Sequence, residues 1–118
     1  MSADDDVRRL AMGLPSVEER PSHGMASWYV AGRIFARLHE EPGVLVCWRA
    51  DLGEREALLQ RDPGTFFTVP HYDGHASVLV RLERIGQAEL GELLREAWES
   101  RAPRRLRDAM ATDPEPSP

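Results

Sequence analysis

The residues best suited to chemistry in this chain lie in one short segment, His71 to His75, which reads His-Tyr-Asp-Gly-His. Two imidazoles and a carboxylate at alternate positions are ligand types that divalent metals use, but they converge on one ion only if the segment folds back on itself. Asp73 and Gly74 are also an ordinary turn pair. We interpret the segment as a structural loop or as the rim of a binding site that uses Tyr72 and His75, and we assign it no metal.

One face of the expected sheet is a second candidate surface. Strand alternation turns an apolar set toward the helices: Ile34, Ala36, Leu38, Val78, Val80 and Leu82. The outward set is then Arg33, Phe35, Arg37 and His39 on one strand, Ser77, Leu79 and Arg81 on the later strand, and Tyr29. Arginines interleaved with aromatic rings suit phosphates and stacked bases. The alternative is a half-solvated sheet face whose aromatic residues cover the edges of the core.

The segment Arg101 to Arg107 is the most concentrated basic patch, with four arginines and no acidic residue. Such a cluster favours nucleic acid because neutralised phosphates release their counterions. Arg104 and Arg105 are its candidate binding residues. The alternative is a solvated helix end, where arginines complement the helix dipole and pair with Glu96 or Glu99.

No group of residues predicts catalysis. Cys47 lies inside the apolar run Val-Leu-Val-Cys-Trp and is expected to be a buried packing residue. Ser77 lacks the flanking glycines of a nucleophile elbow, and the Glu40-Glu41 pair falls in a turn. We therefore expect no enzymatic activity, no catalytic residue and no cofactor.

Hydrophobic spacing indicates the elements that must position these residues. Helices are predicted at 7–14, from about 51 to 61 behind an Asp51 cap, around 90–98, and at 104–110. Strands are predicted at 27–30, 33–39, 44–49, 66–69 and 77–83, with a tight hairpin at Ala31-Gly32 and an irregular stretch before the first strand. This order, α-β-β-β-α-β-β-α, predicts a two-layer α+β domain in which helices pack on an antiparallel sheet of about five strands.

Composition limits the function classes. The chain has 118 residues, a net charge of −5, one cysteine, and arginine as its only basic residue besides histidine. An acidic domain needs a local basic patch to bind DNA. We expect a single domain at 1–110 with a disordered acidic, proline-rich tail at 111–118. We also expect a cytoplasmic protein without a membrane segment, as a monomer or weak dimer.

Four segments together resemble the MmcQ/YjbR family of small bacterial proteins. They are Leu14 to Gly24, Ala31 to Leu38, Pro70 to Leu82 and Ala97 to Leu106. The resemblance implies helices packed against one sheet, in the order given above, and a predicted DNA-binding role without assigned catalytic residues. The same two-layer order of helices and strands also resembles secretion-chaperone-like folds, which work by holding protein partners.

The sequence therefore predicts a non-enzymatic DNA-binding protein that uses an arginine- and aromatic-bearing sheet face and a basic C-terminal end. The predicted binding residues are Arg33, Arg37, Tyr72, His75, Arg81, Arg104 and Arg105. The alternative is a module that binds a protein partner or a small ligand and has no affinity for nucleic acid, which the net charge of −5 favours.

Overall fold

The computed structural model describes residues 1–111, which form four helices and six strands joined by short connections. The helices are α1 (Asp4–Met12), α2 (Leu52–Arg61), α3 (Gln87–Arg101) and α4 (Arg104–Ala111). The strands are β1 (Val17–Ser22), β2 (Met25–Val30), β3 (Arg33–Leu38), β4 (Val44–Trp48), β5 (Phe66–Phe67) and β6 (Ser77–Arg81). Two single 3₁₀ turns, Pro70–Tyr72 and Leu82–Arg84, flank β6.

The strands form one antiparallel sheet in the order β1-β2-β3-β4-β6-β5. Tight turns at His23-Gly24 and Ala31-Gly32 join the first three strands, and all four of these residues have positive φ. Paired positive φ values match the hairpin turn whose twist agrees with that of the flanking strands. The predicted hairpin at Ala31-Gly32 is therefore confirmed.

Strand β1 was not predicted, and its sequence explains why. It carries the charged run Glu18-Glu19-Arg20 followed by Pro21, and four of its six side chains are exposed. Because β1 is an edge strand, its outer edge needs no partner for proline, and its charges do not have to be buried. A strand of this kind lacks the apolar alternation on which strand prediction depends.

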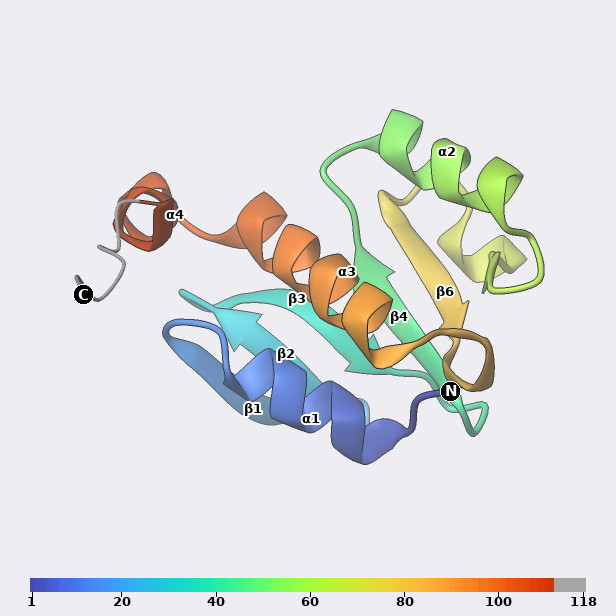
Figure 1. The fold of residues 1–118 in the computed structure, drawn as a ribbon, viewed down its shortest axis with the longest axis horizontal. Coiled ribbons are helices and arrows are strands. Elements are labelled where there is room, and N and C mark those ends of the chain that lie inside the picture. Colours follow the sequence, from blue (N-terminus) through green and yellow to red (C-terminus); the bar gives the residue numbers. More distant parts are fainter. Residues whose placement is uncertain (112–118) are drawn as a thin grey trace.

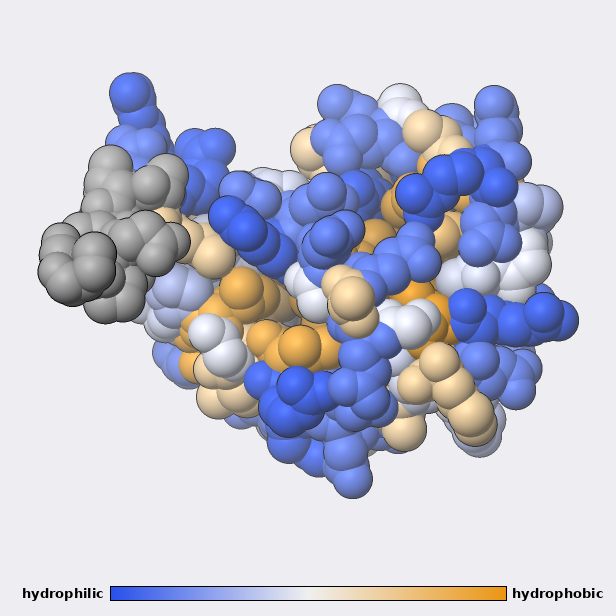
Figure 2. Space-filling view, viewed as in Figure 1, coloured by the Kyte–Doolittle hydropathy of each residue, from blue (hydrophilic) through white to orange (hydrophobic). Residues whose placement is uncertain are grey.

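Helices α1 and α3 lie side by side across one face of the sheet, as Figure 1 shows from the helix side. Between the two layers lies the main core, whose largest fully buried side chains are Trp28, Phe35, Phe66 and Trp98. Gly91 of α3 faces Leu10 of α1, so the helices approach closely. Figure 2 shows that the outside of this face is mostly hydrophilic, with hydrophobic residues visible along the seam between the two helices.

The two-layer α+β fold with an antiparallel sheet is confirmed, with six strands in place of about five. The predicted tail at 111–118 lies outside the described residues apart from Ala111, the last residue of α4. Within residues 1–111, none of the helices has the length and apolar character needed to cross a bilayer.

Candidate functional site

A β-bulge in β3 decides which side chains reach each face of the sheet. Trp28 pairs with Ala36 and Tyr29 pairs with Ile34, so Phe35 is an extra residue on β3. An extra residue shifts the side-chain alternation by one position. The predicted orientation of Ile34 and Phe35 is therefore wrong: Phe35 is buried in the core under the helices, and Ile34 lines a cleft on the opposite face.

The bulge also separates two arginines that were expected on one surface. Arg37, beyond the bulge, points to the face without helices, as predicted. Arg33, before the bulge, reaches the C-terminal end of α3 on the helix side, where its Nη1 donates to the carbonyl oxygen of Arg101 at 3.4 Å. The prediction of a shared Arg33 and Arg37 surface is wrong, because the two side chains lie on opposite faces of the sheet.

The face of β4 and β6 that the helices leave open, called here the outer face, is covered by the segment 68–76. Val44, Val46 and Leu79 form a second, smaller core on this face, and Val69 and Tyr72 of the segment pack against it. In this half of the sheet the outer face is therefore a packed layer and is not half-solvated.

Arg55 of α2 holds this covering segment in place. Its side chain is only 6% exposed. Nε donates to the carbonyl of Ser77 at 2.9 Å, while Nη2 donates to Oγ1 of Thr68 at 2.7 Å and to the carbonyl of Tyr72 at 3.5 Å. A planar guanidinium with five donors can bond groups in several directions at once. One side chain thus joins α2, β6 and the covering segment.

Next to the covering segment lies a cleft of about 580 Å³, called here the outer cleft. Its lining comes from the β1–β2 turn, from β3 and the residues after it, from the end of β4 and from the covering segment: Ser22, His23, Ile34, Arg37, His39, Glu40, Trp48, His71 and Tyr72. A concave site of this volume, with aromatic walls and a few polar groups, is typical of small-molecule binding.

Arg37 and Glu40 form an ion pair in the outer cleft. The Arg37 side chain is 8% exposed; its Nε donates to the Ser22 carbonyl at 3.2 Å, and Nη1 and Nη2 donate to the two Glu40 carboxylate oxygens at 3.3 and 2.5 Å. These bonds lower the pKa of Glu40 to about 2. The bonds to Glu40 also raise the pKa of Arg37, and the nearby Tyr72 hydroxyl adds to the rise. The Glu40 side chain is 59% exposed, so water reaches this carboxylate.

Three of the four histidines of the chain lie near Tyr72, and the fourth, His23, lines the same cleft. His23, His39 and His71 line the outer cleft. The ring centroids of His39, His71 and His75 lie 6.4, 4.9 and 6.0 Å from that of Tyr72. Within the described part of the chain, no three His, Cys, Asp or Glu side chains are arranged to hold a metal ion. The rings of His39 and His71, together with Tyr72, form an aromatic part of the wall of the outer cleft.

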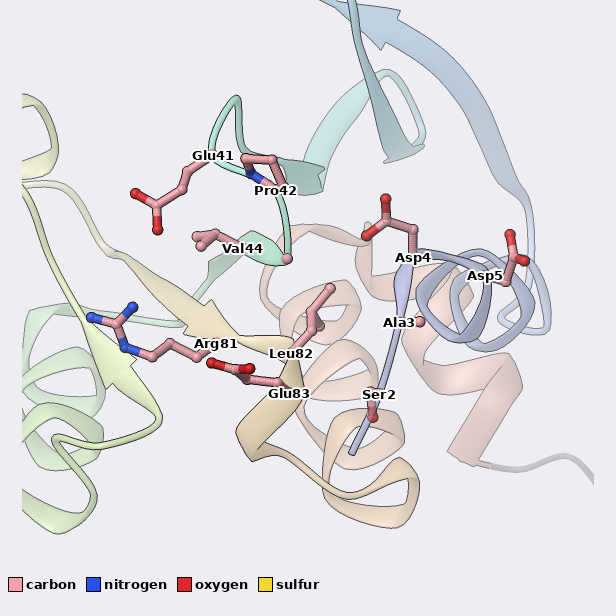
Figure 3. Close-up of a pocket in the computed structure, with 11 residues that line it drawn as sticks. Ser2, Ala3, Asp4, Asp5, Glu41, Pro42, Val44, Arg81, Leu82 and Glu83 are labelled. Atoms are coloured by element: carbon pink, nitrogen blue, oxygen red, sulfur yellow. The ribbon is translucent and has the colours of Figure 1, made fainter.

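A second cleft, of about 560 Å³, lies beside the N-terminal end of α1, and Figure 3 shows its lining. Four carboxylates surround it, from Asp4, Asp5, Glu41 and Glu83. Arg81 is the one basic residue of this lining, and its guanidinium carbon lies 4.1 Å from the centroid of the Phe67 ring. Arg81 is thus surrounded by negative charge and does not share a cleft with Arg37, and this acidic surface disfavours phosphate.

The other predicted arginines lie where α3 meets α4. Arg101, the last residue of α3, is partly buried, and its Nε has no hydrogen-bond partner within residues 1–111. Burial and the charge of Arg33 lower the pKa of Arg101. Among the described residues, neither Arg33 nor Arg101 forms an ion pair with a carboxylate. Two neighbouring guanidinium groups without a counter-charge favour the binding of an anion.

Arg104 and Arg105 begin α4 and are exposed. The Nε of Arg104 lies 3.5 Å from a carboxylate oxygen of Asp108, one helical turn further on. Leu106 and Met110 pack α4 against the main core, beyond the C-terminal end of α3 (Figure 1). We call Arg33, Arg101, Arg104 and Arg105 the arginine cluster.

The seven predicted site residues therefore occupy three places. Arg37 and Tyr72 line the outer cleft, with His75 near Tyr72, Arg81 lines the acidic cleft, and the other three belong to the arginine cluster. The sequence analysis did not select Glu40 or Arg55. The i, i+3 spacing of Arg37 and Glu40 was a usable signal for the ion pair. Arg55 pairs with the adjacent Glu56, but its other partners lie 13 to 22 residues away, where no local spacing indicates them.

Cys47 is fully buried among the helix-side core residues. Burial raises the pKa of its thiol to about 12. The thiolate, which is the nucleophilic form, is therefore scarce at neutral pH. The packing role expected for Cys47 agrees with this position.

Comparison with known proteins identifies the family of the chain. The YjbR family model matches residues 12–100. Uncharacterised proteins of Mycobacterium tuberculosis and Mycobacterium bovis are 37% identical to this chain over 123 aligned residues, covering 90% of this chain and 93% of their own length. The crystal structure of Deinococcus radiodurans protein DR2400, with the family-model domain DUF419, matches with a TM-score of 0.70 and 25% identity over 83% of this chain and 77% of that one. The chain belongs to the YjbR family.

Proposed function

We propose that this protein is a non-enzymatic DNA-binding protein and that the arginine cluster contacts the phosphate backbone. The observation that carries the proposal is the pair formed by Arg33 and Arg101. Their charges lie close enough for Arg33 to lower the pKa of Arg101, and no carboxylate among residues 1–111 compensates them. A phosphate group would supply both the missing negative charge and acceptors for the guanidinium donors.

The start of α4 extends this surface. Arg104 and Arg105 are exposed and follow directly on the α3–α4 joint, so two more guanidinium groups are available to neighbouring phosphates. The net charge of −5 opposes binding elsewhere on the surface, which limits the contact to this end. With three or four phosphate contacts we expect weak, sequence-independent binding, with a dissociation constant of roughly 10⁻⁴ to 10⁻⁶ M that rises steeply with salt.

A fluorescence anisotropy titration with a short labelled DNA duplex, at low salt and at rising salt, tests the proposal. The test variant is the double substitution Arg33→Gln with Arg101→Gln. The matched control is Arg20→Gln with Arg61→Gln, which removes the same charge from two exposed arginines on β1 and α2. We expect the test variant to lose most of its low-salt affinity, about tenfold or more, and the control to lose much less.

Equal losses in the two variants would show that overall charge, and not the arginine cluster, governs binding. No binding of duplex or single-stranded DNA at low salt would contradict the proposed function. In that case a protein partner recovered from nuclease-treated extract would support the alternative, a protein-binding module.

A further inference from the structure

We propose that the outer cleft binds a small aromatic carboxylate, which takes the position of the Glu40 carboxylate on Arg37. The site is independent of the arginine cluster, because Arg37 and Arg33 reach opposite faces of the sheet. The binding of an aromatic acid in this cleft is thus a separate property from contact with DNA.

Arg37 is already arranged to hold a carboxylate. Its Nε is anchored to the Ser22 carbonyl, and its two terminal nitrogens each donate to one oxygen of Glu40. This two-point geometry is the one in which a guanidinium recognises a carboxylate with highest specificity. Because the Arg37 side chain is almost fully buried, its donors are held in place before any ligand arrives.

Glu40 can be displaced. Its side chain lies in the short turn after β3 and is more than half exposed, so water can take over the hydrogen bonds of its carboxylate when a ligand occupies Arg37. Displacement by another carboxylate keeps Arg37 paired. This matters because a buried guanidinium without a partner would be costly.

The walls of the outer cleft carry several aromatic rings. Trp48, Tyr72, His39 and His71 contribute rings, and Ile34 contributes an apolar side chain. Aromatic rings in such a setting prefer offset-stacked or edge-to-face contact with another ring. A volume of about 580 Å³ lies in the range of small-molecule sites. Aromatic walls beside one carboxylate-binding group select a ring that carries an acid.

The sign of the charge distinguishes the outer cleft from its neighbour. The cleft beside α1 is lined by four carboxylates and one arginine, and its electrostatic field repels an aromatic acid. In the outer cleft Arg37 is the one arginine and Glu40 is the one carboxylate, beside three histidines, so release of Glu40 to solvent leaves a positive centre. The position of Glu40 therefore sets the affinity of the site.

Benzoate is a direct probe of the outer cleft. Its binding is measured by amide chemical-shift changes and by calorimetry. Glu40→Gln is the test variant, because glutamine keeps the shape of the side chain and removes the competing charge. Glu41→Gln is its matched control: it removes one charge from the next residue, which lines the other cleft. Benzyl alcohol and benzylamine are the ligand controls, since they keep the ring and change the charged group.

We expect benzoate to shift the amides of residues 22–23, 37–40 and 71–72, and Glu40→Gln to bind it roughly tenfold more tightly than wild type or Glu41→Gln. Ile34→Trp, which fills the cleft without removing the ion pair, should abolish binding. The proposal is overturned if benzylamine or benzyl alcohol binds as well as benzoate. It is also overturned if Glu40→Gln gains no affinity or if the shifts lie outside the cleft.

Discussion

The two faces of the sheet are covered in different ways. On the helix side, α1 and α3 enclose a continuous core in which Trp28, Phe35 and Trp98 are fully buried. On the outer side, a covering segment without a regular helix is held down by the guanidinium of Arg55, and an ion pair lies beside it. The apolar packing between the two helices and the sheet leaves no room for a ligand. The polar contacts that hold the covering segment leave a cleft beside it. We infer that the packed core of the helix side supplies stability, and that binding falls to the arginine cluster at the end of α3 and to the outer cleft.

The largest effect is expected from truncating the helix-side core. Trp98 is fully buried, and its Nε1 donates to the Pro15 carbonyl at 3.0 Å. Trp98→Ala should lower the free energy of unfolding by about 3–5 kcal/mol, because it removes a large ring and leaves a cavity. Tyr72→Ala on the outer side should cost about 1–2 kcal/mol, since that ring is only partly buried. Equal losses of unfolding free energy in the two variants, measured by denaturant unfolding, would contradict the difference between the two faces.

The next effect concerns Arg55. Arg55→Met should lower the free energy of unfolding by about 2–3 kcal/mol, because the buried Ser77 carbonyl and the partly buried acceptors on Thr68 and Tyr72 lose their donor. Amide hydrogen exchange in segment 68–76 should rise more than in α3. Arg61→Met is the control on the same helix; its side chain is exposed, so the change should stay within about 1 kcal/mol. If amide hydrogen exchange in the covering segment is unchanged in Arg55→Met, Arg55 does not hold that segment in place.

A smaller effect, which depends on pH, is expected for Glu40→Gln. The pKa of Glu40 is about 2 in the folded protein, against 4.5 for an ordinary glutamate, so the ionised side chain stabilises the fold. This contribution is complete above about pH 4.5 and is lost as the pH falls toward 2. Unfolding of wild type and Glu40→Gln should therefore differ at neutral pH and converge in acid. A difference in unfolding free energy that persists at pH 2 would show that it has another cause. Glu41→Gln is the control, since it removes one charge from the same turn.

Most of the helix side could be predicted from the sequence. The helices α2 and α3, the Ala31-Gly32 hairpin and the antiparallel sheet follow from apolar spacing and turn chemistry, which are local properties. The cap is also local: the Asp51 side chain accepts from the Glu54 amide at 2.9 Å, as its spacing predicted. Alternation likewise placed Val78 and Val80 in the core.

The outer side could be predicted only in part. Arg37 and Tyr72 were selected and lie in one cleft. The bulge at Phe35 could not be predicted from the sequence, because it depends on how β2 and β3 pair and not on the composition of either strand. The bulge separated Arg33 from Arg37, and it put Phe35 into the core. The role of Arg55 escapes sequence analysis because two of its partners are backbone carbonyls, which every residue has, and the hydroxyl of Thr68 is 13 residues away.

The central claim is that the two sides of the sheet carry separate binding surfaces, and amide chemical-shift mapping of the uniformly labelled protein tests it most directly. Duplex DNA at low salt should shift amides at 31–33 and 100–111, and benzoate should shift those at 22–23, 37–40 and 71–72. Each ligand should also leave the affinity for the other unchanged. DNA shifts centred on the outer cleft, or benzoate shifts centred on the α3–α4 joint, would contradict the account.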